Sequence, residues 1–214
     1  MVCLSYRGYW TSRGRPSERG INKDAEAAAR WIADRSQQES EGSGTSPVLI
    51  LWGQSVGTGF ATNLAVSPNF PESLLLDSLI LETPFLSMKE MLGAVYPGKW
   101  VPYRYLWPFL RNHLDNWGNM GALAARSRDR GVVPPRVFIL EAGRDELVPQ
   151  SHAEGICTRC EEVGLPIEKA AVPLAFHNEA ILRGEGKRAV TRAIEMHAAE
   201  AGRRRMGREP GKLS

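Results

Sequence analysis

Residues 47–59 read PVLILWGQSVGTG, and this stretch decides the fold that we predict. Its apolar run at 48–52 is too short for a typical helix and is bounded by turn-forming residues, so it predicts a buried strand. A Gly-x-Ser-x-Gly pattern centred on Ser55 follows, and then a segment that predicts a helix from residue 58 to about 66. This order of strand, sharp turn and helix is typical of a turn that presents a nucleophilic serine.

The chemistry of such a turn explains the residue types around Ser55. A serine in a sharp turn has a strained backbone, and we expect the flanking Gly53 and Gly57 to relieve the crowding because they lack a Cβ. The N-terminus of the following helix favours developing negative charge, and the Val56 N–H is predicted to be an oxyanion donor. The alternative is an ordinary strand-to-helix turn that happens to contain a serine.

The composition fits a single α/β domain. The chain has 214 residues, of which 43% are hydrophobic and 24% charged. It contains no run of 18 apolar residues, so the sequence predicts no membrane span, and its N-terminus does not have the pattern of a signal peptide. We therefore place one domain at 1–202, followed by a basic tail at 203–214 that we predict to be disordered.

The charge distribution bears on partners. The net charge is +3, and the tail alone carries five basic residues and one acidic residue. Such a tail is usually solvated, and it lacks interleaved aromatics or a groove-reading motif, so we predict no nucleic-acid partner. Contact with an anionic membrane surface is the alternative role for it.

The three cysteines do not suggest a disulfide framework. Cys157 and Cys160 form a C-x-x-C pattern in a predicted helix, where they share one face. Zinc would require a second pair of ligands, and a redox role would require a thioredoxin-like setting. We interpret both residues as structural, expect a reducing compartment, and predict neither a metal nor a cofactor.

Strands and helices alternate along the chain, which predicts a mostly parallel, doubly wound α/β sheet. Strands are predicted at 2–6, 48–52, 78–82, 137–140 and 167–172. Helices are predicted from residue 17 or 21 to 37, from 58 to 66, from 151 to 163 and from 187 to 202. Residues 38–46 are rich in Gly and Ser and are predicted to be mobile, and residues 83–135 hold no clear strand.

Two further residues complete a catalytic pattern with Ser55. Asp145 follows the strand at 137–140, and His177 follows the strand at 167–172. In parallel sheets the working residues lie in loops at the carboxyl ends of strands, and the order Ser, Asp, His is the one found in hydrolases of this fold. We predict that His177 takes the proton of Ser55 and that Asp145 orients His177. Glu146 is the nearest alternative to Asp145 as the acid. His152 and His197 lie on predicted helices and fit the role of the base poorly, whereas His113 is kept as an alternative to His177.

The middle segment, about 86–133, is predicted to be a helical cap inserted over the catalytic edge. It is rich in aromatic residues, and an aromatic-rich lid suits an apolar substrate better than a sugar or a nucleotide. The alternative is that these aromatics pack the cap onto the sheet. The candidate substrate-binding residues are Trp100, Tyr103, Trp107 and Phe109.

Several of these stretches together resemble the alpha/beta-hydrolase superfamily, and within it the bud-emergence-type and related abhydrolase-domain serine hydrolases. The matching stretches are YRGY at 6–9, PSE at 16–18, GQSVG at 53–57, LETPF at 81–85, DELVP at 145–149 and HN at 177–178. The resemblance implies hydrolysis of ester or thioester bonds in acyl-bearing substrates, either lipids or acylated proteins. It implies an intracellular location, with endomembrane association as an open alternative, although the N-terminal anchor common in complete relatives is not seen.

The sequence also departs from that family. Trp10 and Phe176 stand where a Gly is usual, and residues 2–6 match the fourth strand of the fold, so its first three strands are not seen. The loop that normally supplies the second oxyanion donor is among them, and loss of one donor typically lowers turnover by about 10²–10³. Either residues 2–6 pair directly with 48–52, or the chain is an incomplete copy of a larger protein, which is the alternative that we favour.

The sequence therefore predicts a serine hydrolase that acts on a small-molecule or acyl-lipid substrate. A serine peptidase is a less favoured alternative within the same fold. From a different class, the chain could act as an inactive binding module, because strands that contribute to catalysis are not seen.

Overall fold

The computed structural model describes residues 1–43, 47–95 and 112–206, and these ranges contain one parallel sheet. Its strands lie in the order β1-β2-β3-β4 and all neighbours are parallel. The strands are β1 Leu49–Gln54, β2 Leu76–Glu82, β3 Arg136–Ala142 and β4 Ile167–Val172. The parallel α/β sheet is therefore confirmed, and four of the five predicted strands form it.

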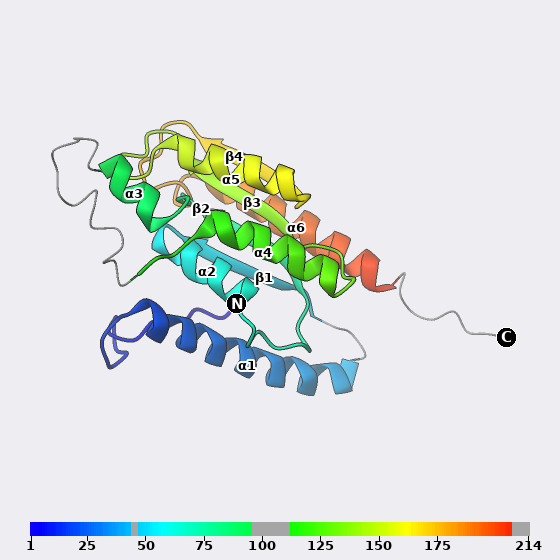
Figure 1. Ribbon diagram of the computed structural model, residues 1–214. Helices are drawn as coiled ribbons and strands as arrows, with labels where there is room; N and C mark the ends of the chain where they lie inside the picture. Colours follow the sequence, from blue (N-terminus) through cyan, green and yellow to red (C-terminus); the bar gives the residue numbers. More distant parts are fainter. Residues whose placement is uncertain (44–46, 96–111, 207–214) are drawn as a thin grey trace.

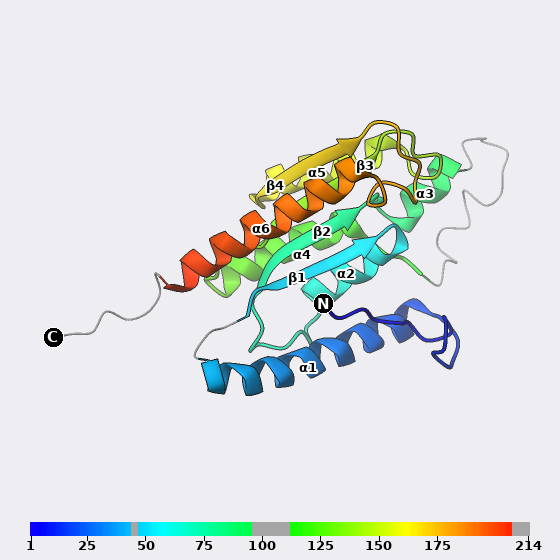
Figure 2. The same ribbon diagram turned by 180° about the vertical axis from the view of Figure 1, so that it is seen from behind.

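Helices cover both faces of this sheet. One face carries α2 (Val56–Val66), α4 (Asn116–Asp129) and α5 (Gln150–Val163), which pack side by side (Figure 1). The other face carries α6 (Gly184–Met206), which crosses β2, β3 and β4 (Figure 2). The long α1 (Glu18–Ser43) packs against α2, and the short α3 (Met88–Val95) follows β2.

The alternating side chains of the central strands supply a core on each face. Leu79, Leu81 and Ile139 point toward α2, α4 and α5, whereas Ile80 and Phe138 point toward α6. Every residue of β2 is buried, as expected for a strand that helices cover on both faces. Because the strands are parallel, the loops that follow them meet at one edge of the sheet.

The strand predicted at residues 2–6 is wrong. This segment has no regular secondary structure and does not pair with β1, so the alternative of a direct pairing with residues 48–52 is also wrong. The side chains of Val2 and Leu4 are exposed, and Tyr6 packs its ring against Phe60 of α2. Within the described residues β1 is therefore an edge strand, and its Trp52 is 41% exposed.

Two helices run further than predicted. α1 continues to Ser43 through most of the segment predicted to be mobile, and the Ser40 hydroxyl donates to the Ser36 carbonyl oxygen. α6 continues to Met206, into the predicted tail, where Arg205 forms an ion pair with Asp77 at 2.6 Å. The described part of the chain has no helix that is both long and apolar enough to cross a membrane.

Candidate active site

Ser55 lies in a strained turn between β1 and α2. Its backbone has φ 50° and ψ −118°, a conformation that non-glycine residues rarely adopt. Hydrogen bonds hold it on both sides. The Ser55 N–H donates to the Glu82 carbonyl oxygen at 2.9 Å, and the Ser55 carbonyl accepts from the Thr58 N–H at 2.9 Å and from the Thr58 hydroxyl at 2.6 Å. The turn therefore holds its conformation through the end of β2 and the first turn of α2.

The two glycines of the motif differ in the space available for a side chain. A Cβ on Gly53 would lie 2.2 Å from the Gly57 carbonyl oxygen, a distance that no real Cβ tolerates. A Cβ on Gly57 would meet no described atom within 4 Å. The expectation that both glycines relieve crowding is thus met at Gly53 and is wrong at Gly57.

The side chains of Ser55, His177 and Asp145 form one hydrogen-bonded chain. His177 Nε2 lies 2.8 Å from Ser55 Oγ, and His177 Nδ1 lies 2.8 Å from Asp145 Oδ2 and 3.0 Å from Oδ1. Asp145 Oδ1 also accepts the Leu147 N–H at 2.9 Å and the Val148 N–H at 2.8 Å. The side chains of His177 and Asp145 are 3% and 5% exposed, so water screens their interaction poorly.

This geometry fits general-base chemistry. A carboxylate at Asp145 only accepts, so it favours the tautomer in which Nδ1 carries the proton. Nε2 is then the acceptor that faces the Ser55 hydroxyl, as activation of a serine requires. Val56 is the first residue of α2, so its N–H has no acceptor within the helix and lies next to the serine. This is the position of a donor to an oxyanion.

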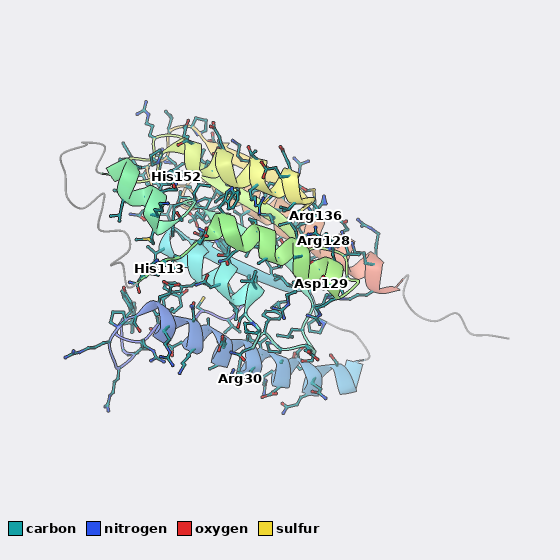
Figure 3. All side chains as sticks on the ribbon, in the orientation of Figure 1. Arg30, His113, Arg128, Asp129, Arg136 and His152 are labelled. Atoms are coloured by element: carbon teal, nitrogen blue, oxygen red, sulfur yellow. The ribbon has the colours of Figure 1, made fainter. Side chains whose placement is uncertain are left out.

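The other sequence candidates lie elsewhere. Glu146 accepts the backbone N–H of His177 at 3.0 Å and thus holds the loop rather than the imidazole. His152 accepts the Leu86 N–H at 3.0 Å from the end of α5 that faces α3, and the His113 N–H donates to Glu18 near the start of α1 (Figure 3). His197 pairs with Ser78 on the other face of the sheet. Trp100, Tyr103, Trp107 and Phe109 lie outside the described residues.

The cysteines of the C-x-x-C pattern are poorly suited to nucleophilic chemistry. Burial raises the pKa of the Cys160 thiol to about 12 and raises the pKa of Cys157 as well. Both are therefore protonated at neutral pH, and the thiolate is the reactive form of cysteine.

One acidic residue at this edge was missed as a functional candidate. Glu82 ends β2 and its side chain is buried. Its carboxyl group bonds to Gln54, which directly precedes Ser55, and to Ile181, which lies four residues after His177. The sequence feature that points to it is a charged residue directly after the apolar run at 79–81, at the end of a predicted buried strand.

Comparison with known proteins shows similarity to hydrolases. No protein-family model matches the chain. It is 38% identical over 149 residues to the lysophosphatidylserine lipase ABHD12 of Rattus norvegicus, a match that covers 70% of this chain and 35% of the lipase. It is 30% identical over 180 residues to an uncharacterised protein of Mycobacterium tuberculosis, which covers 84% of this chain and 53% of that protein. The chain thus spans about half, or less, of the length of these relatives.

Solved structures share the fold at low sequence identity. The Pyrococcus furiosus esterase Pf2001 superposes with a TM-score of 0.60 at 16% identity, covering 89% of this chain and 66% of the esterase. Esterase 2 of Thermogutta terrifontis, in a form phosphorylated by paraoxon, superposes with a TM-score of 0.56 at 17% identity, covering 90% of this chain and 67% of the esterase. The chain therefore has the alpha/beta-hydrolase fold, and it is similar in sequence to a lipase and in structure to esterases.

Proposed function

We propose that this protein is a serine hydrolase that cleaves ester or thioester bonds of acyl-bearing substrates. The observation that carries the proposal is the hydrogen-bonded chain from Ser55 through His177 to Asp145. Ser55 Oγ attacks the acyl carbon while His177 Nε2 takes its proton, and His177 then returns the proton to the leaving group. Water repeats these steps on the acyl-enzyme, which releases the acid and regenerates Ser55. The Val56 N–H stabilises the oxyanion.

An apolar acyl group is supported by the loops around His177. Four apolar side chains on the loops after β3 and β4 are exposed between 45% and 68%: Leu147, Leu174, Phe176 and Leu182. The backbones of the two loops are joined, because the Arg144 N–H donates to the Ala175 carbonyl at 2.9 Å. The names of the relatives, a lysophosphatidylserine lipase and several esterases, support the same substrate class.

Labelling with a fluorophosphonate tests the proposal directly. The probe forms a bond between phosphorus and an activated serine oxygen and expels fluoride. We expect the wild type to be labelled at Ser55, and we expect Ser55→Ala and His177→Ala to lose the label. Peptide mass mapping identifies the modified residue.

A second serine–histidine pair in the chain provides a matched control. Ser78 Oγ lies 2.7 Å from His197 Nδ1, but both side chains are buried between the sheet and α6. Ser78→Ala should therefore leave the labelling unchanged. A folded wild type that takes no label, or a label that persists in Ser55→Ala, would contradict the proposal. The first outcome would favour the inactive binding module.

A further inference from the structure

Glu82 is a buried acid at the carboxyl end of β2, one of the two interior strands of the described sheet. It lies in register with Gln54 of β1 and with Leu140 of β3, and the residue is 2% exposed. Burial of a carboxyl group is costly unless hydrogen bonds replace its water. The partners of this carboxyl therefore indicate what the residue contributes.

These partners belong to the two segments that carry the candidate nucleophile and base. Glu82 Oε1 accepts the N–H of Ile181 at 3.1 Å, and Ile181 follows His177 in the same loop. The same oxygen accepts from Gln54 Nε2 at 3.3 Å, and Gln54 directly precedes Ser55. The backbone carbonyl of Glu82 accepts the Ser55 N–H at 2.9 Å. One residue thus bonds both to the turn at residues 53–57, here called the nucleophile turn, and to the loop at residues 173–183, here called the histidine loop.

The end of β2 is a rigid support for both the nucleophile turn and the histidine loop. The strand is buried along its whole length, and the next residue, Thr83, donates its N–H to the Leu140 carbonyl at 2.8 Å. Thr83 has a φ of 46°, so the chain leaves the sheet abruptly at this point. The carboxyl of Glu82 is thereby held at the sheet edge while the loops on either side bond to it.

We propose that Glu82 is a positioning residue that sets the contact between His177 and Ser55, holding the histidine loop with its carboxyl group and the nucleophile turn with its carbonyl. This inference rests on the proposed hydrolase function. The Ser55–His177 contact is 2.8 Å, and a displacement of about 1 Å at a reacting centre can lower a rate by about 10². Loss of the Ile181 anchor would free the loop to move by such an amount.

The ionisation of Glu82 gives a separate readout of this arrangement. Burial raises the pKa of the Glu82 carboxyl, while the Ile181 N–H, the Trp52 side chain and a positive charge on His177 oppose that rise. The groups that face the carboxyl are therefore Gln54 and Trp52 from β1 together with Ile181 and His177 from the loop after β4. The amide proton of Ile181 should report the titration, because it donates directly to the carboxylate.

The decisive experiment compares Glu82 with a matched acid on the same strand. Asp77 lies near the other end of β2, is 7% exposed, and accepts the Leu49 N–H at 2.9 Å. We expect Glu82→Ala to slow fluorophosphonate labelling by about 10²-fold in a protein that is still folded. Glu82→Gln should recover much of that loss because its amide oxygen still accepts the Ile181 N–H. Asp77→Ala should lower stability but leave the labelling rate within about threefold of the wild type.

Each outcome decides between the proposals. Equal labelling of the wild type and Glu82→Ala, or equal slowing in Asp77→Ala, would overturn the positioning role alone, whereas an unlabelled wild type would overturn the hydrolase proposal as well. Nuclear magnetic resonance adds a test that needs no activity. The Ile181 amide proton should titrate with a midpoint above the ordinary carboxyl value of about 4.3, and this titration should vanish in Glu82→Gln. A flat Ile181 signal in the wild type would overturn the contact on which the inference rests.

Discussion

Single residues at the nucleophile turn combine strain with close packing. Ser55 adopts a positive φ that glycine would accept more readily, and Gly53 provides the space in which the turn can close. Trp10 also has a positive φ, of 50°, and its side chain is 94% exposed. The family preference for Gly at that position thus has a backbone explanation, which the sequence alone did not supply.

The contrast between the two motif glycines can be measured. Gly53→Ala places a methyl group against the Gly57 carbonyl, so we expect it to reduce the free energy of unfolding by about 3 kcal/mol and to abolish labelling. Gly57→Ala lies in the first turn of α2 with open space around it, and should change that free energy by less than about 1 kcal/mol. Urea denaturation of both variants checks this expectation. Equal losses would show that the turn is not closed as described.

The role of Asp145 can be separated from that of its neighbour Glu146. Asp145→Asn replaces an acceptor with an amide that can also donate to Nδ1, which favours the wrong tautomer of His177. In serine proteases the equivalent change lowers turnover by about 10⁴, and we expect a fall in labelling rate of that order. Glu146→Gln keeps an oxygen for the His177 N–H, so its effect should stay below about tenfold. A larger fall in labelling rate for Glu146→Gln than for Asp145→Asn would indicate that Glu146, and not Asp145, orients His177.

At the scale of elements, a buried polar network joins α2 to α4. The Asn116 amide group donates to the Thr58 hydroxyl at 3.0 Å and to the Phe85 carbonyl at 2.7 Å, and its oxygen accepts from the Thr62 hydroxyl at 2.7 Å. Thr58 in turn donates to the carbonyl of Ser55. The helix that follows Ser55 is therefore held by hydrogen bonds as well as by apolar packing.

Removal of the Asn116 side chain from this network should lower the free energy of unfolding more than removal of a neighbouring amide group. Asn116→Ala leaves the buried Phe85 carbonyl without its donor and removes the bonds to Thr58 and Thr62, so we expect the free energy of unfolding to fall by about 2–3 kcal/mol. Asn119 is one helical turn further on and half-buried, with bonds to Thr62 and Asn63. Asn119→Ala should lower the free energy of unfolding by less than half as much as Asn116→Ala. Denaturation curves with equal slopes for the two variants would make the comparison valid, and equal losses would argue against the network.

The sequence predicted those features of the elements that depend on local pattern. The apolar runs gave the four parallel strands, and the position of Asp145 and His177 after two of them predicted the edge at which they meet Ser55. Features that depend on distant partners were not predictable in this way. Residues 2–6 have a strand-like pattern but pair with no strand, and α6 runs on to Arg205, which bonds to Asp77 far away in the chain. The bond from Glu82 to Ile181 is of the same kind.

At the scale of the whole molecule, two buried histidines make stability depend on pH. Burial lowers the pKa of His152, which Glu90 partly opposes, and that of His197, which Glu168 and Glu200 partly oppose while Arg136 adds to the shift. Below the unfolded value of about 6.5 the unfolded chain therefore binds protons that the folded protein does not. The free energy of unfolding should fall as the pH is lowered from about 6.5 toward the folded pKa values.

Urea midpoints at neutral and mildly acidic pH test this dependence. The wild type should lose stability on acidification, and a double variant, His152→Gln with His197→Gln, should lose less over the same range. Glutamine retains an acceptor for the Leu86 N–H and a partner for the Ser78 hydroxyl, so the variant changes the titration more than the packing. An identical pH dependence in both proteins would assign the effect to other groups.

The order of the strands has a consequence for folding during synthesis of the protein. Since β1 to β4 follow one another in space as they do in sequence, the sheet can be extended one strand at a time during translation. Roughly 120 residues separate Ser55 from His177, and a ribosome adding about 5–20 residues per second needs about 6–24 s to make them. A nascent chain thus displays its serine long before the histidine that would activate it. If Ser55 and His177 act together as we propose, an unfinished chain is inactive, because β4 and the loop after it must be synthesised before the two side chains can meet.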